Sequence, residues 1–109
     1  MPRAPGHLRP ETRQWWNRYA ATHKLREPQL RLLTMAGEAW DRSIQARLAV
    51  EEEGLIYRDR FGQPRPRPEV AMEKEAKLLF ERLLRALAQA LQQEEAQLPE
   101  WLKGGLRFK

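Results

Sequence analysis

Apolar residues recur at helical spacing in three stretches of the chain. In the first, expected over residues 11–23, two tryptophans and a tyrosine share one side of the helix. The second is a long helix over residues 28–53, and the third runs from residue 68 to about residue 93. Proline stands before or at the start of each stretch, and Gly54 follows the second as a C-terminal stop.

The second helix carries a stripe with alternating spacings of three and four, as in a coiled coil. The stripe consists of Leu30, Leu33, Gly37, Trp40, Ile44 and Leu48. Gly37 within it predicts the close approach of another backbone, with room for a tryptophan. The third helix has an apolar arc of roughly 140°, wider than one antiparallel partner covers. The surplus can meet the first helix, another subunit, or both.

Residues 54–68 connect the two long helices. A β-branched and aromatic run followed by a Gly-containing turn predicts a small β-hairpin or an ordered loop. We expect residues 1–10 to form a flexible basic arm, 11–93 a helical core and oligomerisation domain, and 94–109 a basic-apolar tail. The expected fold class is mainly α: a short N-terminal helix and a long antiparallel helix pair joined by the connector.

The net charge of +5 is unevenly distributed. Residues 1–26 carry +5 and residues 55–68 carry +3, whereas both long helical stretches are acidic. A positive footprint attracts polyanions, most often nucleic acid, although the same charge can simply maintain solubility. The candidate DNA-binding residues are Arg3, Arg9, Arg13, Arg18, Lys24, Arg26, Arg58, Arg60, Arg65 and Arg67.

Composition argues against several classes of chemistry. The absence of cysteine removes disulfides, thiolate metal sites and a cysteine nucleophile, and it fits a reducing cytoplasm. No apolar run is long enough to span a bilayer, and the start lacks the apolar stretch of a signal peptide. His7 and His23 are too far apart to be a ligand pair on one helix. Because no phosphate loop or catalytic triad is present, we expect no enzyme, cofactor or metal.

The acidic run at residues 51–53 and the tail at residues 94–109 each allow two interpretations. Glu51-Glu52-Glu53 either pairs with arginines of the next segment or a neighbouring subunit, or forms a solvated charge run. The tail either docks a partner or packs back on its own bundle. Its candidate docking residues are Trp101, Leu102, Leu106 and Phe108.

Three segments of the connector resemble one protein family. The similarity is to the terminase small subunits of tailed bacteriophages. It is carried by Glu52-Glu53-Gly54-Leu55-Ile56-Tyr57, then Phe61-Gly62-Gln63-Pro64, then Pro68-Glu69-Val70, which opens a leucine-rich helix. The resemblance covers roughly residues 11–90 and includes Trp40-Asp41-Arg42 upstream. At Leu87-Ala88-Gln89 the chain departs from the family, whose last helix often ends there in a Leu-Gly-Leu turn.

The resemblance implies a non-enzymatic protein of the host bacterial cytoplasm. Such subunits assemble as homo-oligomeric rings, bind double-stranded viral DNA and regulate the large terminase subunit, which holds the ATPase and nuclease of genome packaging. The tail would contact the large subunit. Residues expected in the core and part of the subunit contact are Leu33, Trp40, Ile44, Leu79, Phe80, Leu83 and Leu87. The alternatives are a coiled-coil adaptor or assembly protein, and a small dimeric DNA-binding regulator.

Overall fold

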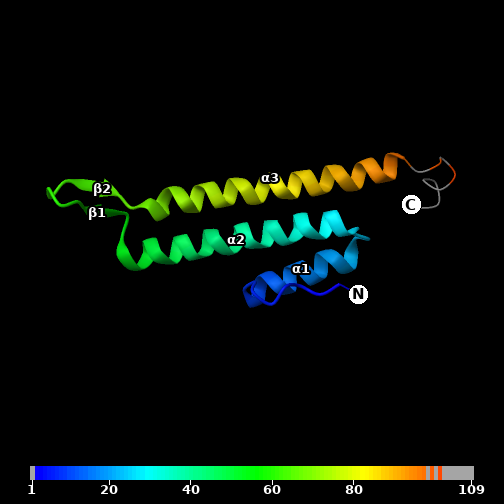
Figure 1. Cartoon of the computed structure of the whole chain (residues 1–109), viewed down its shortest axis with the longest axis horizontal. Coiled ribbons are helices and arrows are strands. Elements are labelled where there is room, and N and C mark those ends of the chain that lie inside the picture. Colours follow the sequence, from blue (N-terminus) through cyan, green and yellow to red (C-terminus); the bar gives the residue numbers. More distant parts are fainter. Residues whose placement is uncertain (1, 98, 100, 102–109) are drawn as a thin grey trace.

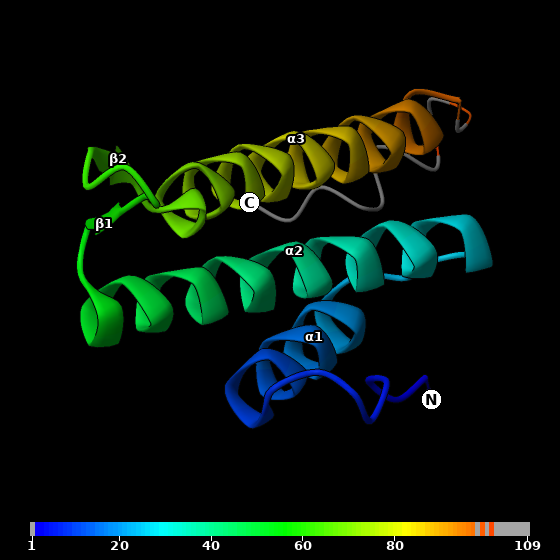
Figure 2. The same ribbon diagram turned by 60° about the vertical axis from the view of Figure 1, so that its left-hand side comes forward.

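The chain is mainly helical in its computed structural model, which describes residues 2–97, 99 and 101. Two long helices lie antiparallel, a β-hairpin projects from one end, and a shorter helix lies along the half far from the hairpin (Figures 1 and 2). The molecule measures 69 × 25 × 25 Å. The elements are α1 (Pro10–Thr22), α2 (Glu27–Glu53), β1 (Ile56–Arg58), β2 (Pro64–Pro66) and α3 (Pro68–Ala96).

The helix boundaries follow the proline and glycine punctuation of the sequence. Each of the three helices has proline in its first turn, where the missing amide costs no hydrogen bond. Gly54 ends α2 with φ +94°, a conformation that side chains rarely adopt. The predicted mainly α fold is confirmed, and α3 extends three residues past the expected end at Gln93.

The connector is the predicted hairpin. Strands β1 and β2 pair antiparallel, with Tyr57 opposite Arg65. Gly62 closes the turn with φ +77°, which favours glycine. The hairpin therefore forms a small projection that joins the long helices without packing against their sides (Figure 1).

The seam between α2 and α3 differs from the stripe expected for it. Ala36 and Ala39 pack against Leu83. Ser43, four residues after Ala39, and Ala46, three residues after Ser43, are also buried. These positions keep heptad spacing, as a helix pair requires. Because the residues are small, the two helices can approach closely. Of the expected stripe, Gly37 lies against Leu8 and Thr12, whereas Leu33 and Trp40 contact Leu87 and Phe80 of α3 from beside this seam.

Gly37 makes room for side chains of the N-terminal region. A Cβ atom added there would lie 3.2 Å from Leu8 Cδ1 and 3.2 Å from Thr12 Cγ2. The predicted close approach at Gly37 is therefore present, but the partner is neither a backbone nor a tryptophan. Leu8, Trp16 and Leu33 form one core cluster with Leu87 of α3.

Residues 4–9 are folded onto the helices, which differs from the flexible arm expected for residues 1–10. Leu8 is 2% exposed. The Ala4 amide donates to Asn17 Oδ1 at 2.9 Å, and the Arg9 amide donates to Asp41 Oδ2 at 2.8 Å. One buried leucine and these hydrogen bonds offset the entropy lost when the segment is ordered.

Part of the wide apolar arc meets α1, and part remains uncovered. Phe80 of α3 contacts Trp15 of α1, with ring centroids 5.7 Å apart. Met72 and Leu79 of α3 are 44% and 37% exposed, and Met35 of α2 is 47% exposed. In one copy of the protein, part of the apolar surface of the helices is therefore in contact with solvent.

Candidate nucleic-acid interface

The N-terminal basic residues divide into side chains that have partners and side chains that do not. The Arg13 guanidinium donates to the Gly6 carbonyl at 2.9 Å, and Arg26 Nε lies 3.2 Å from Glu94. Among the described residues, the side chains of Arg3, Arg9, Arg18 and Lys24 form no hydrogen bond or ion pair. Arg9 is half-buried, whereas Arg3, Arg18 and Lys24 are exposed and thus available to an anionic partner.

Asp41 fixes the N-terminal region to the long helix. The residue is 8% exposed, and its carboxylate accepts hydrogen bonds from the Arg9 amide at 2.8 Å and the Thr12 hydroxyl at 2.5 Å. Arg9 occupies the N-cap position of α1 without a side-chain cap of its own. Asp41 therefore satisfies the backbone amide of the N-cap residue, and its negative charge lies at the positive end of the α1 dipole.

Three of the four connector arginines stabilise the hairpin. Arg58 donates to the Gly62 carbonyl at 2.8 Å, and Arg65 Nε donates to Asp59 Oδ2 at 3.1 Å. Arg67 donates to the carbonyls of Gly54 at 3.0 Å and Glu53 at 3.1 Å. Cations at the C-terminal end of a helix satisfy its last carbonyls and oppose its negative dipole end. These guanidinium groups therefore have structural partners in addition to any role toward DNA.

Asp59 organises the hairpin turn. Its carboxylate accepts hydrogen bonds from the amides of Phe61 at 2.9 Å and Gln63 at 3.0 Å, as well as from Arg65. The Gln63 amide first, then the Arg65 guanidinium and the Phe61 amide, hold the pKa of Asp59 below its ordinary value. The turn is consequently built around an ionised carboxylate.

The fourth connector arginine, Arg60, lies at the hairpin tip. Its guanidinium carbon is 5.1 Å from the centroid of the Phe61 ring, within cation–π range. Phe61 itself is 75% exposed. The acidic run at the end of α2 does not pair with these arginines among the described residues: Glu51 pairs with Arg47 at 3.1 Å.

The two basic groups of residues do not form one surface within a chain. The hairpin lies at one end of the helix pair, and α1 lies along the other half (Figures 1 and 2). A DNA segment that contacts both groups on a single chain would have to follow much of the 69 Å length of the molecule.

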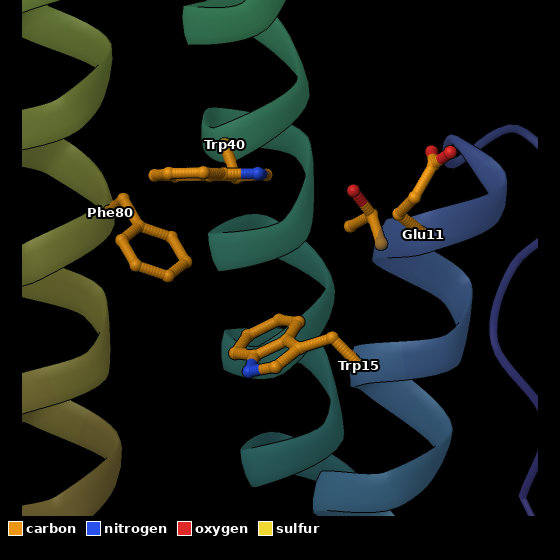
Figure 3. Close-up of a pocket in the computed structure, with 5 residues that line it drawn as sticks. Glu11, Trp15, Trp40 and Phe80 are labelled. Carbon is orange, nitrogen blue, oxygen red and sulfur yellow. The ribbon is translucent and has the colours of Figure 1, made fainter.

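An apolar pocket lies where the three helices meet. Trp15 of α1, Trp40 of α2 and Phe80 of α3 line a cavity of about 260 Å³, together with Glu11 and Thr12 (Figure 3). The ring centroids of Trp40 and Phe80 are 5.2 Å apart. Trp40 is 39% exposed, so it borders the pocket and does not fill the core as its spacing predicts. The sequence shows the aromatic residues. That they line one pocket depends on how α1 packs across α2 and α3, which the sequence pattern does not indicate.

The predicted core residues differ in burial, and most of the predicted docking residues of the tail lie outside the described part of the chain. Leu33, Leu83 and Leu87 are buried, Ile44 and Phe80 are half-buried, and Leu79 is exposed. Trp101 is 77% exposed, whereas Leu102, Leu106 and Phe108 lie outside the described residues.

The two histidines contact different partners. His7 Nε2 lies 2.8 Å from Glu38, and His23 stacks on Tyr19 with ring centroids 4.3 Å apart. Burial raises the pKa of Tyr19.

Within residues 2–97, 99 and 101, no group of three or more His, Asp or Glu side chains is arranged to hold a metal ion. None of the helices in this part of the chain has the combination of length and apolarity needed to cross a membrane. Comparison with family models, curated proteins and solved structures finds no match for this chain.

Proposed function

We propose that this chain is the small subunit of a viral terminase. In this role it is a non-enzymatic, oligomeric protein that binds double-stranded viral DNA and recruits or regulates the large ATPase-nuclease subunit in the host bacterial cytoplasm. The connector resemblance supports the family, and two of its residues, Gly54 and Gly62, have positive φ at the end of α2 and in the hairpin turn.

The DNA-binding part of the proposal rests on basic side chains of the N-terminal region that have no partner within the described part of the chain. Residues 1–26 hold a net charge of +5, and Arg3, Arg18 and Lys24 have no partner in the described part of the chain. Asp41 joins this region to α2 through hydrogen bonds from Arg9 and Thr12. Basic side chains on a fixed platform lose less entropy when they align with phosphates.

Assembly into an oligomer would raise the affinity for DNA above that of one chain. Each copy offers only a few free cations, so a single site binds DNA weakly. Several copies in one oligomer raise the effective concentration of sites and convert weak contacts into avidity. The uncovered Met35, Met72 and Leu79 provide apolar surface for subunit contacts.

Duplex DNA binding at varied salt tests the proposal. The variant Arg18→Ala/Lys24→Ala removes two free cations, and Lys74→Ala/Arg82→Ala on α3 is its control with the same change in net charge. We expect the first variant to weaken binding and to reduce the slope of log affinity against log salt by about two per chain. Equal effects of the two variants, or a flat salt response of the wild type, would sink the DNA-binding role.

A specific observation favours a second candidate, a coiled-coil adaptor. Three connector arginines bind groups of their own chain, which reduces the surface dedicated to phosphates. An adaptor oligomerises in the absence of DNA binding. Retained oligomer mass with no measurable duplex affinity at low salt would therefore select it.

A further inference from the structure

The hairpin tip presents an aromatic side chain outward. Phe61 lies in the turn between β1 and β2 and is 75% exposed. The hairpin lies at one end of the helix pair (Figure 1). The turn beneath it is held by Asp59 through the amides of Phe61 and Gln63, so the tip has a defined shape. Arg60 stacks on the same ring. Exposing a phenyl ring on a well-ordered turn loses the hydrophobic free energy that burial would provide.

The pocket among the three helices offers a matching recess. Trp15, Trp40 and Phe80 line it, and Glu11 stands at its edge (Figure 3). Its volume is about 260 Å³, whereas an apolar cavity of about 150 Å³ accommodates benzene. Glu11 is exposed and has no ion pair among the described residues.

We propose that Phe61 of one copy inserts into this pocket of a second copy, where Arg60 pairs with Glu11. The inference rests on the self-assembly in the proposed function and names the contact that produces it. Shape, aromatic character and charge all select this occupant: a phenyl ring enters an aromatic recess, and the adjacent cation meets an unpaired carboxylate at the rim.

The contact has to join different copies. The pocket lies at Trp40, roughly 20 Å along α2 from the point at which the hairpin begins. The hairpin extends away from the helix pair, so its tip cannot reach the pocket of its own chain (Figures 1 and 2). Each copy carries one tip and one pocket. Such a heterologous contact, repeated head to tail, closes into a ring when the rotation between copies allows it.

Solution mass as a function of concentration tests the contact. Phe61→Ala removes the ring from an exposed position, so the fold stays intact, and Leu55→Ala is the control for another exposed apolar residue of the connector. We expect Phe61→Ala to raise the apparent dissociation constant of self-association on the order of tenfold or more. Leu55→Ala should leave it within about twofold.

Charge reversal tests the ionic part of the same contact. Glu11→Arg and Arg60→Glu should each weaken association, and the double variant should recover most of the loss. Lys74→Glu, an exposed charge reversal on α3, is the control and should have little effect. Failure of the double variant to recover association would remove Arg60–Glu11 from the contact.

Cross-linking locates the contact independently of affinity, because the chain contains no cysteine. Gln14→Cys on α1 and Gln63→Cys beside the tip keep Phe61, Arg60 and Glu11 in place. A short bismaleimide should link these two positions between copies. Gln63→Cys with Gln92→Cys on α3 should link far less.

The outcomes separate this contact from the proposed function. A wild type that assembles while Phe61→Ala assembles equally well overturns the tip-and-pocket contact and leaves the oligomeric DNA-binding role standing. A wild type that stays monomeric with DNA overturns both. Loss of assembly in Phe61→Ala, with salt-sensitive DNA binding retained at lower affinity, supports both.

Discussion

The carboxylate of Asp41 accepts a hydrogen bond of 2.5 Å from the hydroxyl of Thr12, and together they join the first turn of α1 to the middle of α2. Asp41→Ala leaves the Thr12 hydroxyl and the Arg9 amide without their acceptor in a buried site. We expect a loss of about 1–3 kcal/mol in the free energy of unfolding, measured by urea denaturation. Asp41→Asn retains an acceptor oxygen and should lose less. A change below about 0.5 kcal/mol for the alanine variant would contradict this role.

Gly37 sets the distance between α2 and the N-terminal segment. A leucine at this position would occupy the space of Leu8 and Thr12 Cγ2, both 3.2 Å from an added Cβ. We expect Gly37→Leu to displace residues 4–9 and to cost about 1–3 kcal/mol, despite the better helix propensity of leucine. Faster hydrogen exchange at the Leu8 and Arg9 amides provides the measurement. Ala21→Leu, on the exposed side of α1, is the control.

Arg67 caps the C-terminal end of α2 through the carbonyls of Glu53 and Gly54. Arg67→Ala should fray the last turn and destabilise the fold by about 0.5–1.5 kcal/mol, seen as lost amide protection near Val50. Arg60→Ala, which removes a tip arginine without a carbonyl partner among the described residues, should leave stability nearly unchanged. Equal stability of the two variants would show that the Arg67 hydrogen bonds contribute nothing.

The hairpin should lose structure in acid. The pKa of Asp59 is lowered in the folded hairpin by the Gln63 amide, Arg65 and the Phe61 amide. Its stabilising effect is therefore complete above the unfolded pKa of about 3.9 and is lost as pH falls through the lower folded value. Amide chemical shifts of Phe61 and Gln63 should report this transition. In Asp59→Asn the transition should disappear, and its persistence would assign it to another group.

The sequence predicted the helices and hairpin because proline and glycine mark their ends. Pro10, Pro28 and Pro68 open the helices, and Gly54 closes α2 where the left-handed region requires glycine. These signals are local, and they need no knowledge of tertiary packing.

The helix seam was not predictable from hydrophobic periodicity. Ala36, Ala39, Ser43 and Ala46 are small, so they contribute little to an apolar stripe, while larger side chains one position away dominate the pattern. The folded N-terminal segment was missed for a related reason. Its order depends on one leucine that meets Gly37 and on a carboxylate that lies 32 residues away in the sequence.

The candidate site was predicted in part. Charge alone identified the N-terminal cations, and Arg3, Arg18 and Lys24 remain available. The connector arginines could not be assigned from sequence, because most of their acceptors are backbone carbonyls that are positioned only when the hairpin folds. The aromatic pocket depends in the same way on three helices meeting.

The mass of the wild-type protein in solution, measured by light scattering at moderate salt with and without duplex DNA, tests the proposed role most directly. A ring-forming DNA-binding subunit should give a closed oligomer well above a dimer, with a further increase in mass when duplex is bound. A monomer or dimer that remains so in the presence of DNA would contradict the role.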